Sequence, residues 1–247
     1  MDGDPLFGLA PRTTALLIID MIHHQLTPGE GFLGDLARQG TDIGYFDRRV
    51  RTQLVPNLVR LAARCRALGA TVAHVRVGAF REDYSDLVPS FREAFASWGA
   101  REGSRACAPI DALRPAPGDI DLVKTGSGAF NGSGLDSHFR NIGIRDILYA
   151  GVITNGCVLL SAAAGFDLGY TGHLVTDATA TLSDRLQQAA EETMALYVAK
   201  PLTTEEAIRA LERAARGKAE GGPSRYASRR TEPTPPRGMA REPEFRG

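Results

Sequence analysis

Short continuous runs of apolar residues alternate with longer amphipathic segments along residues 1–216. A continuous apolar run is typical of a strand buried on both faces, whereas apolar residues three or four positions apart are typical of a helix. The predicted strands span residues 15–20, 71–77, 121–123, 146–151 and 173–176. The predicted helices span residues 54–68, 157–168, 184–196 and 203–215.

This alternation predicts a parallel sheet with helices on both of its faces. The expected fold is a three-layer, Rossmann-like α/β fold around a central, mostly parallel six-stranded sheet. Ligands of such folds bind at the carboxyl ends of the strands. The residues at those ends are therefore the first candidates for a functional site.

Residues 217–247 differ in composition from the rest of the chain. Five prolines and five glycines fall among these 31 residues, together with seven basic and four acidic residues. Such a segment buries too little apolar surface to offset the entropy lost on ordering. We predict one domain over residues 1–216 and a C-terminal tail that is disordered or packs on a neighbouring subunit.

Charge and composition exclude several classes of function. The 247 residues are 43% hydrophobic, and 29 basic residues balance 29 acidic ones, which argues against binding to nucleic acid or to an anionic membrane surface. Three cysteines cannot form a disulfide scaffold, and no apolar run is long enough to span a membrane. The first residues lack the pattern of a secretory signal, so we expect a cytoplasmic protein.

Three strand ends carry side chains suited to catalysis. Asp20 ends the first strand, Lys124 follows the third, and Cys157 follows the fourth. Each alone has a simpler interpretation, respectively a capping aspartate, a solvated lysine and a small buried cysteine. Together they would place an acid–base group, a cation and a thiol at one edge of the sheet, as nucleophilic catalysis requires.

Cys157 opens the predicted helix at 157–168, where unpaired N–H groups and the helix dipole favour an anion. With a lysine nearby, we expect the pKa of this thiol to lie below its usual value of about 8.5. Asp20 is the expected acceptor of the thiol proton and its later donor to a leaving amine. We predict that Cys65 is structural and that Cys107 is incidental.

The glycines of residues 126–132 superficially resemble a dinucleotide-binding loop. The last interval is one residue too long, however, and the first strand-to-helix turn, where such a loop belongs, contains no glycine. The sequence therefore does not favour nucleotide binding.

Two runs resemble motifs of the isochorismatase-like cysteine hydrolases. Residues 121–135 (DLVKTGSGAFNGSGL) resemble the lysine motif of that family, and residues 151–158 (GVITNGCV) resemble its nucleophile motif. Asp177 and Ala178 also fit, and the resemblance covers about residues 12–200. It implies a Rossmann-like parallel sheet, an Asp–Lys–Cys triad and a homodimer or homotetramer.

The resemblance assigns roles to individual residues of this chain. The triad maps onto Asp20, Lys124 and Cys157. A cis peptide before the nucleophile maps onto Val152–Ile153. The backbone N–H groups of Ile153 and Cys157 are the expected oxyanion hole.

Members that hydrolyse the isochorismate vinyl ether do without the cysteine, so its presence favours cleavage of an amide-type C–N bond. The nicotinamidases carry a metal cluster after the second strand, but residues 74–84 contain no such cluster, and the adjacent pair His23–His24 is no substitute. We therefore expect no metal and no other cofactor.

The resemblance is thus to the metal-free amidohydrolase branch, which includes N-carbamoylsarcosine amidase, ureidoacrylate amidohydrolase and biuret hydrolase. We expect a small amide or ureido substrate. The alternatives are vinyl-ether hydrolysis and a catalytically silent domain that serves in binding or assembly.

Substrate contacts are predicted in three places. Residues 26–47 form a long insert whose aromatic residues Phe32, Tyr45 and Phe46 either line the pocket or form a small surface cluster. Arg76, at the end of the second strand, pairs either with a substrate carboxylate or with a neighbouring acid. Thr154 and Asn155 lie beside the nucleophile and are candidates for contacts with the substrate amide.

Overall fold

The computed structural model describes residues 9–220 of the 247-residue chain, with side chains described as far as Arg216. The domain boundary predicted at 216 falls inside the last helix, α9 (Thr204–Glu220). The prediction for the rest of the tail, residues 221–247, lies outside the described residues.

One six-stranded sheet forms the centre of the molecule, with the order β3-β2-β1-β4-β5-β6. All neighbouring strands are parallel, which confirms the predicted fold class. The strands are β1 (Thr14–Ile19), β2 (Thr71–Val77), β3 (Ile120–Lys124), β4 (Asp146–Val152), β5 (Thr171–Ala180) and β6 (Lys200–Leu202).

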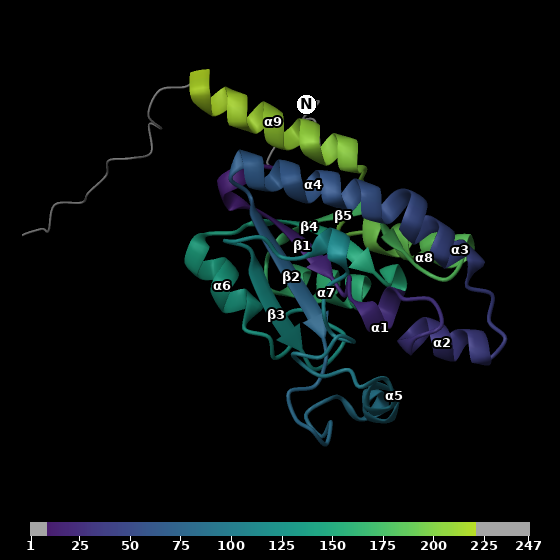
Figure 1. Ribbon diagram of the computed structural model, residues 1–247. Helices are drawn as coiled ribbons and strands as arrows, with labels where there is room; N and C mark the ends of the chain where they lie inside the picture. Colours follow the sequence, from purple (N-terminus) through teal and green to yellow (C-terminus); the bar gives the residue numbers. More distant parts are fainter. Residues whose placement is uncertain (1–8, 221–247) are drawn as a thin grey trace, which may run out of the picture.

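Helices cover both faces of this sheet (Figure 1). The longer ones are α4 (Val55–Leu68), α6 (Leu135–Ile142), α7 (Leu159–Asp167), α8 (Asp184–Ala195) and α9. One face packs against α4 and α9, and the other against α6, α7 and α8. The four predicted helices are therefore confirmed, although α6 was not predicted and α7 begins two residues later than expected.

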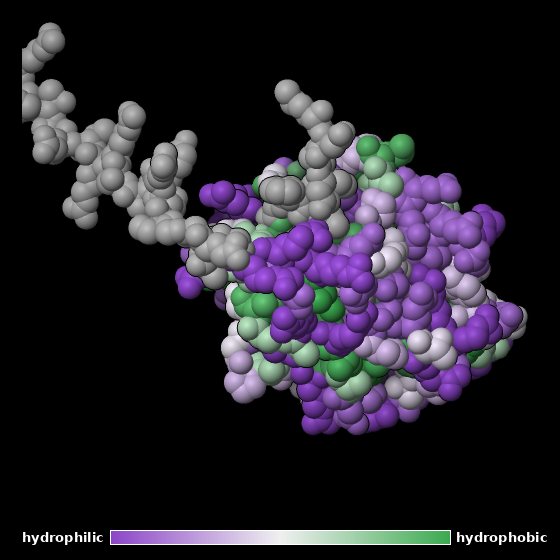
Figure 2. All heavy atoms as spheres, turned by 90° about the horizontal axis from the view of Figure 1, so that it is seen from above, coloured by the Kyte–Doolittle hydropathy of each residue, from purple (hydrophilic) through white to green (hydrophobic). Residues whose placement is uncertain are grey.

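The apolar stripe of α4 explains its place against the sheet. Leu58, Leu61 and Cys65 recur at helical spacing and are all fully buried. On the outer side, Arg60 pairs with Glu205 at 2.9 Å and Arg64 pairs with Glu212 at 2.6 Å, both across to α9. The view onto these helices is accordingly dominated by hydrophilic side chains (Figure 2).

Shorter elements gather at the carboxyl edge of the sheet. The insert after β1 is largely helical, and its residues Phe32 and Phe46 pack on the core. Beyond β2, the chain forms α5 beside the ends of β2 and β3 (Figure 1). These elements are α1 (His23–Leu26), α2 (Gly31–Arg38), α3 (Gly44–Arg49), η2 (Val50–Leu54), η3 (Pro89–Phe91), α5 (Arg92–Trp98) and η4 (Asp111–Leu113), while η1 (Pro11–Thr13) precedes β1 at the opposite edge.

Gly151 allows β4 to approach β1 closely. Its φ is +111°, and a Cβ atom at this position would lie 2.1 Å from the carbonyl oxygen of Ile19. The register of β4 against β5 also shifts between Tyr149 and Gly151. The chain thus leaves β4 along a path that only glycine permits, immediately before the turn that carries Cys157.

Candidate active site

Asp20 follows the last residue of β1 and is only 1% exposed. Its φ is +53°, a conformation that aspartate adopts more readily than most residues. One carboxylate oxygen, Oδ1, accepts a hydrogen bond of 2.8 Å from the N–H group of Val77. The other, Oδ2, accepts one of 2.9 Å from Nζ of Lys124. Two neighbouring strands therefore fix the carboxylate in place.

Lys124, the last residue of β3, is fully buried. Its ammonium group donates to three acceptors, which are Oδ2 of Asp20 at 2.9 Å, the carbonyl oxygen of Gly126 at 3.0 Å and that of Ser127 at 2.8 Å. Three donors meet three acceptors, a match that the planar guanidinium of arginine does not offer. Burial lowers the pKa of Lys124, but the negative charge of Asp20 and the Cys157 thiol raise this pKa by more than burial lowers it. The net shift is therefore upward, and the ammonium stays charged.

Cys157 lies in η5 (Thr154–Val158), a turn of π-helix between β4 and α7, and is partly exposed. Burial, followed by the negative charge of Asp20, raises the pKa of its thiol to about 12, and the positive charge of Lys124 only partly opposes this. The expected lowering of this pKa was therefore wrong. Cys157 precedes α7 instead of opening it, and Asp20 offsets the lysine. The same interactions show that the structure brings Asp20, Lys124 and Cys157 together.

Several groups shape the turn around Cys157. The peptide bond between Val152 and Ile153 is cis. Gly156 lacks a Cβ atom where one would lie 2.9 Å from Cγ1 of Ile153. The buried hydroxyl of Ser161 donates to the carbonyl oxygen of Cys157 at 2.6 Å and accepts from the N–H group of Ala129 at 2.9 Å.

Ser161 thus connects the turn that contains Cys157 to the loop that follows Lys124. Sequence reasoning missed this residue. The available signal was a serine four positions after Cys157 in a helix that is otherwise apolar as far as Phe166, since such a hydroxyl commonly bonds the carbonyl one turn earlier.

The two residues Thr154 and Asn155, close to Cys157, face different surroundings. Thr154 is fully buried, and its hydroxyl donates to Oε1 of Gln187 at 2.7 Å. It is therefore not placed to contact a substrate. Asn155 is exposed, and its Oδ1 accepts a hydrogen bond of 2.6 Å from the hydroxyl of Thr181. Asn155 stays a candidate for substrate binding.

Arg76 points away from the triad. Its guanidinium pairs with Asp121 through bonds of 2.7 and 3.0 Å and donates to the carbonyl oxygen of Cys107 at 3.0 Å. Side chains alternate between the two faces of a strand. Arg76 therefore lies on the α4 face with Val72, whereas Val75 packs on the face that carries Cys157. Of the two predicted partners, the structure supports the neighbouring acid.

The aromatic residues of the insert do not line the triad. Phe46 is 1% exposed and belongs to the core beneath α4, where Phe32 also packs. The hydroxyl of Tyr45 donates to Oδ1 of Asp184, at the start of α8, over 3.3 Å. Neither alternative, a pocket wall or a separate surface cluster, describes Phe32 and Phe46, which pack on the core.

The two adjacent histidines diverge. Nε2 of His24 lies 3.1 Å from the carbonyl oxygen of Val77, and its ring stacks on Trp98. Nδ1 of His23 lies 3.2 Å from the hydroxyl of Thr27. Among residues 9–216, no three His, Cys, Asp or Glu side chains lie close enough to hold a metal ion.

The two other cysteines are buried. Cys65 packs beneath α4, as predicted. The thiol of Cys107 donates to the carbonyl oxygen of Val77 at 3.4 Å and packs beside Phe95. Cys107 is therefore a packed core residue and not incidental.

Asp177, the other position that fits the family motif, lies apart from the triad. Its Oδ1 accepts hydrogen bonds from the N–H group and the hydroxyl of Thr204, and its Oδ2 accepts one of 3.1 Å from Nδ2 of Asn57. It joins β5 to the beginning of α9 and to α4. The geometry therefore gives Asp177 a structural role.

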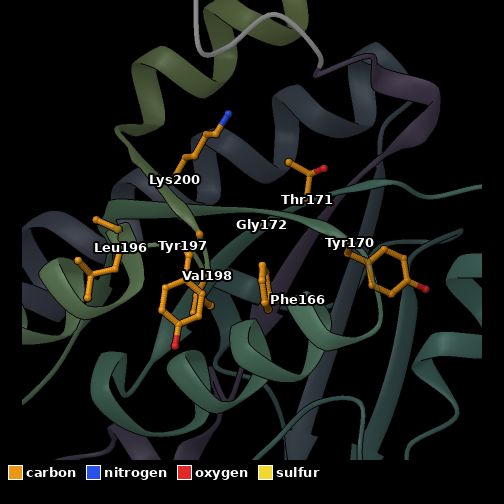
Figure 3. A pocket seen from close by; sticks show the side chains of 10 residues that line it. Phe166, Tyr170, Thr171, Gly172, Leu196, Tyr197, Val198 and Lys200 are labelled. Carbon is orange, nitrogen blue, oxygen red and sulfur yellow. The ribbon is translucent and has the colours of Figure 1, made fainter.

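A hollow of about 320 Å³ opens at the opposite edge of the sheet, where β5 and β6 begin. Phe166, Tyr170 and Tyr197 line it, with Lys200 at its rim (Figure 3). It does not include any member of the triad. In the part of the chain that the structure describes, no helix is long and apolar enough to cross a membrane.

Comparisons with known proteins identify the family and support the fold. A family model described as an isochorismatase domain matches residues 14–206. A ureidoacrylate amidohydrolase, RutB, from Rhizobium rhizogenes is 30% identical over 197 residues, which cover 73% of this chain and 76% of that protein.

Two solved structures are similar over most of their length. A cysteine hydrolase from Pseudomonas syringae pv. phaseolicola has a TM-score of 0.70 at 22% identity, covering 83% of this chain and 95% of its own. An isochorismatase family protein from Desulfovibrio vulgaris has a TM-score of 0.69 at 28% identity, covering 81% of this chain and 99% of its own.

Proposed function

Because the chain belongs to the isochorismatase family, we propose that it is a cysteine-dependent amidohydrolase. In this proposal it cleaves a C–N bond of a small amide or N-carbamoyl compound and releases ammonia. The observation that carries it is the position of Cys157, a partly exposed residue, beside the buried pair of Asp20 and Lys124. The similarity to a ureidoacrylate amidohydrolase supports this class of substrate.

The first step is transfer of the thiol proton. Since the pKa of Cys157 is raised to about 12, the resting thiol is protonated near neutral pH and needs a base. Asp20 is that base. Each carboxylate oxygen accepts one hydrogen bond within the protein and keeps a further lone pair for the thiol proton.

The thiolate then attacks the carbonyl carbon of the substrate, and a C–S bond forms. The backbone N–H groups of Ile153 and Cys157 stabilise the negative oxygen of the tetrahedral intermediate. Asp20 passes its proton to the nitrogen as the C–N bond breaks, so ammonia leaves and a thioester remains. Water, giving a proton to Asp20, hydrolyses the thioester to the acid, and that proton returns to Cys157.

Lys124 stays charged and keeps its hydrogen bonds throughout this cycle. Its three hydrogens are directed to Asp20 and to two carbonyl oxygens, so it orients the base and provides a positive charge beside the thiolate. Asn155, exposed in the same turn, contacts the substrate amide in this proposal. The expected homodimer or homotetramer stays a prediction.

Ammonia release from a panel of small amides and N-carbamoyl compounds, including ureidoacrylate, tests the proposal. We expect activity in the wild type and in Cys65→Ala, a matched control in the buried core, and none in Cys157→Ala. Near-normal turnover by Cys157→Ala would overturn the mechanism. Pyruvate release from isochorismate, measured in parallel, detects ether hydrolysis, and silence in every assay favours a binding or assembly domain.

A further inference from the structure

A buried glutamine on α8 is bonded to the turn that carries the nucleophile. Gln187 is 2% exposed, and its Oε1 accepts the hydrogen bond of 2.7 Å from the hydroxyl of Thr154. Thr154 is the first residue of η5, the turn that contains Cys157. The mechanism proposed above assigns no role to either Thr154 or Gln187.

The remaining bonds of Gln187 fix the orientation of its amide. Nε2 donates to Oε1 of Glu191 at 2.7 Å and to the hydroxyl oxygen of Thr179 at 3.1 Å. An ionised carboxylate only accepts hydrogen bonds, so the NH₂ group must face Glu191 and the oxygen must face Thr154. The hydroxyl of Thr154 is consequently the donor.

The far end of this chain of bonds is anchored in rigid structure. Arg49 of α3 donates to the carbonyl oxygens of Thr176 and Thr179 in β5, at 2.7 and 2.9 Å. Its guanidinium also lies 3.9 Å from Oε1 of Glu191. Gln187 therefore connects the turn that contains Cys157 to α8 and β5 directly, and to α3 through Glu191 and Arg49.

The turn depends on such a connection because its own backbone is irregular. Gly156 lies outside the helical region of φ and ψ, and regular α-helix begins only at Leu159. Ser161 attaches the turn at its carboxyl side, through the carbonyl oxygen of Cys157. The bond from Thr154 attaches it at the amino side.

We propose that Gln187 is a positioning residue that, through the hydroxyl of Thr154, holds the η5 turn so that Cys157 faces Asp20 and Lys124. The reaction it serves rests on the proposed function, but the position of the thiol does not. Catalysis is sensitive to small displacements, and about 1 Å can cost on the order of 100-fold in rate.

Four variants test this proposal. Gln187→Met keeps the approximate volume and removes both the acceptor and the donors, and Thr154→Val removes only the hydroxyl. Thr154→Ser keeps the hydroxyl and removes only the methyl group. Gln188→Met is the matched control on the same helix, where the amide makes an exposed bond of 2.8 Å to Asp184. Thr154→Val is the milder change and keeps the test usable if Gln187→Met folds poorly.

Two readouts separate positioning from general stability. The first is the pH profile of iodoacetamide alkylation at Cys157, located by mass spectrometry of the peptide. The second is kcat and KM for ammonia release. We expect Gln187→Met and Thr154→Val to lower kcat on the order of 10- to 100-fold with KM within about twofold of wild type.

The same variants should shift the alkylation profile to lower pH. Burial is the largest cause of the raised pKa of Cys157, and a loosened turn exposes the thiol. Thr154→Ser and Gln188→Met should retain wild-type values in both assays.

Wild-type kcat and alkylation profiles in folded Gln187→Met and Thr154→Val would overturn the proposal, as would a Thr154→Ser variant that behaves like Thr154→Val. Alkylation requires no substrate, so this result stands even if the wild type releases no ammonia. Failure of the amidohydrolase proposal is recognised separately, by ammonia release that persists in Cys157→Ala.

Discussion

Oδ2 of Asp20 and Nζ of Lys124 lie 2.9 Å apart, and both side chains are almost completely shielded from solvent. Burying two charges is costly, and the cost is offset only where geometry is good and the remaining hydrogen-bonding capacity is used. Here the other oxygen of the carboxylate bonds to Val77, and the other two hydrogens of the ammonium bond to backbone carbonyls. The pair is therefore a structural element as well as part of the candidate active site.

Replacing Lys124 by Met should destabilise the fold strongly. The change leaves the charge of Asp20 buried without its partner, which typically costs about 3–5 kcal/mol. Denaturant unfolding monitored by circular dichroism measures the loss. Arg81→Ala, which removes the exposed ion pair with Asp83, is the control and should leave stability nearly unchanged. Equal stability of Lys124→Met and wild type would contradict this account of the pair.

Replacing Asp20 by Asn should make the Cys157 thiol more reactive toward alkylating reagents and at the same time reduce catalysis. The negative charge of Asp20 raises the pKa of Cys157, while the positive charge of Lys124 lowers it. Asn at position 20 removes the negative charge and leaves the positive charge of Lys124 in place. The pKa of Cys157 therefore falls, and the thiolate fraction at about pH 8 increases. Iodoacetamide alkylation of Cys157 should become faster while ammonia release falls. Slower alkylation in Asp20→Asn would show that the assigned sign is wrong.

The close approach of β4 to β1 makes Gly151 a sensitive position. Alanine there must adopt a φ of +111° and place its Cβ near the carbonyl oxygen of Ile19. At Gly143, which has a φ of +79° but open space around it, the same substitution meets only the backbone penalty of about 1–2 kcal/mol for a left-handed L-residue. We expect Gly151→Ala to lose clearly more unfolding free energy than Gly143→Ala. Comparable losses would mean that the strands separate without cost.

Stability should decrease on mild acidification, partly through His24. Burial lowers the pKa of His24 in the folded protein, and burial likewise lowers that of His74. The unfolded chain takes up these protons at about pH 6.5, before the folded protein does. The contribution of these two neutral histidines to the free energy of unfolding is therefore complete above about pH 6.5 and is lost as the pH falls.

Unfolding free energies measured between about pH 7 and pH 5 should show a smaller decline for His24→Gln than for wild type. Part of the decline should remain because His74 is still present. His138→Gln, at an exposed histidine, is the control. An identical decline in wild type and His24→Gln would exclude a contribution from His24.

Arg76 should contribute to the fold and not to substrate affinity. It lies on the opposite face of the sheet from Cys157 and pairs with Asp121. We expect Arg76→Gln to reduce stability modestly while KM for ammonia release stays within about twofold of wild type. A large increase in KM with an acidic substrate, absent with a neutral one, would restore the carboxylate-binding role.

Local patterns were sufficient to predict most of the central sheet. The strands before Asp20 and Cys157 are almost entirely apolar, and the order of strands with helices between them determines a parallel sheet. Asp20, Lys124 and Cys157 could be selected because parallel strands bring their carboxyl ends to one edge. β6 was missed because it has only three residues, one of them Pro201, and lies at the edge of the sheet.

What could not be predicted depends on contacts between distant segments. The pKa of Cys157 depends on a carboxylate 137 positions earlier in the chain (157 − 20) and on burial, neither of which local sequence shows. The face on which Arg76 lies follows from strand register, and the partner of Thr154 lies 33 positions away on α8. The spacing of apolar residues within the insert also cannot show that Phe46 packs in the core.

The fully bonded ammonium of Lys124 also determines how the protein can be labelled. Only three of its residues are lysines, namely Lys124, Lys200 and Lys218. Amine-reactive reagents need an accessible, unprotonated amine, and Lys124 offers neither. Lys200 is exposed at the amino end of β6, at the edge of the sheet opposite Asp20. Coupling to a solid support through Lys200 would therefore leave the edge that carries the candidate active site facing the solution.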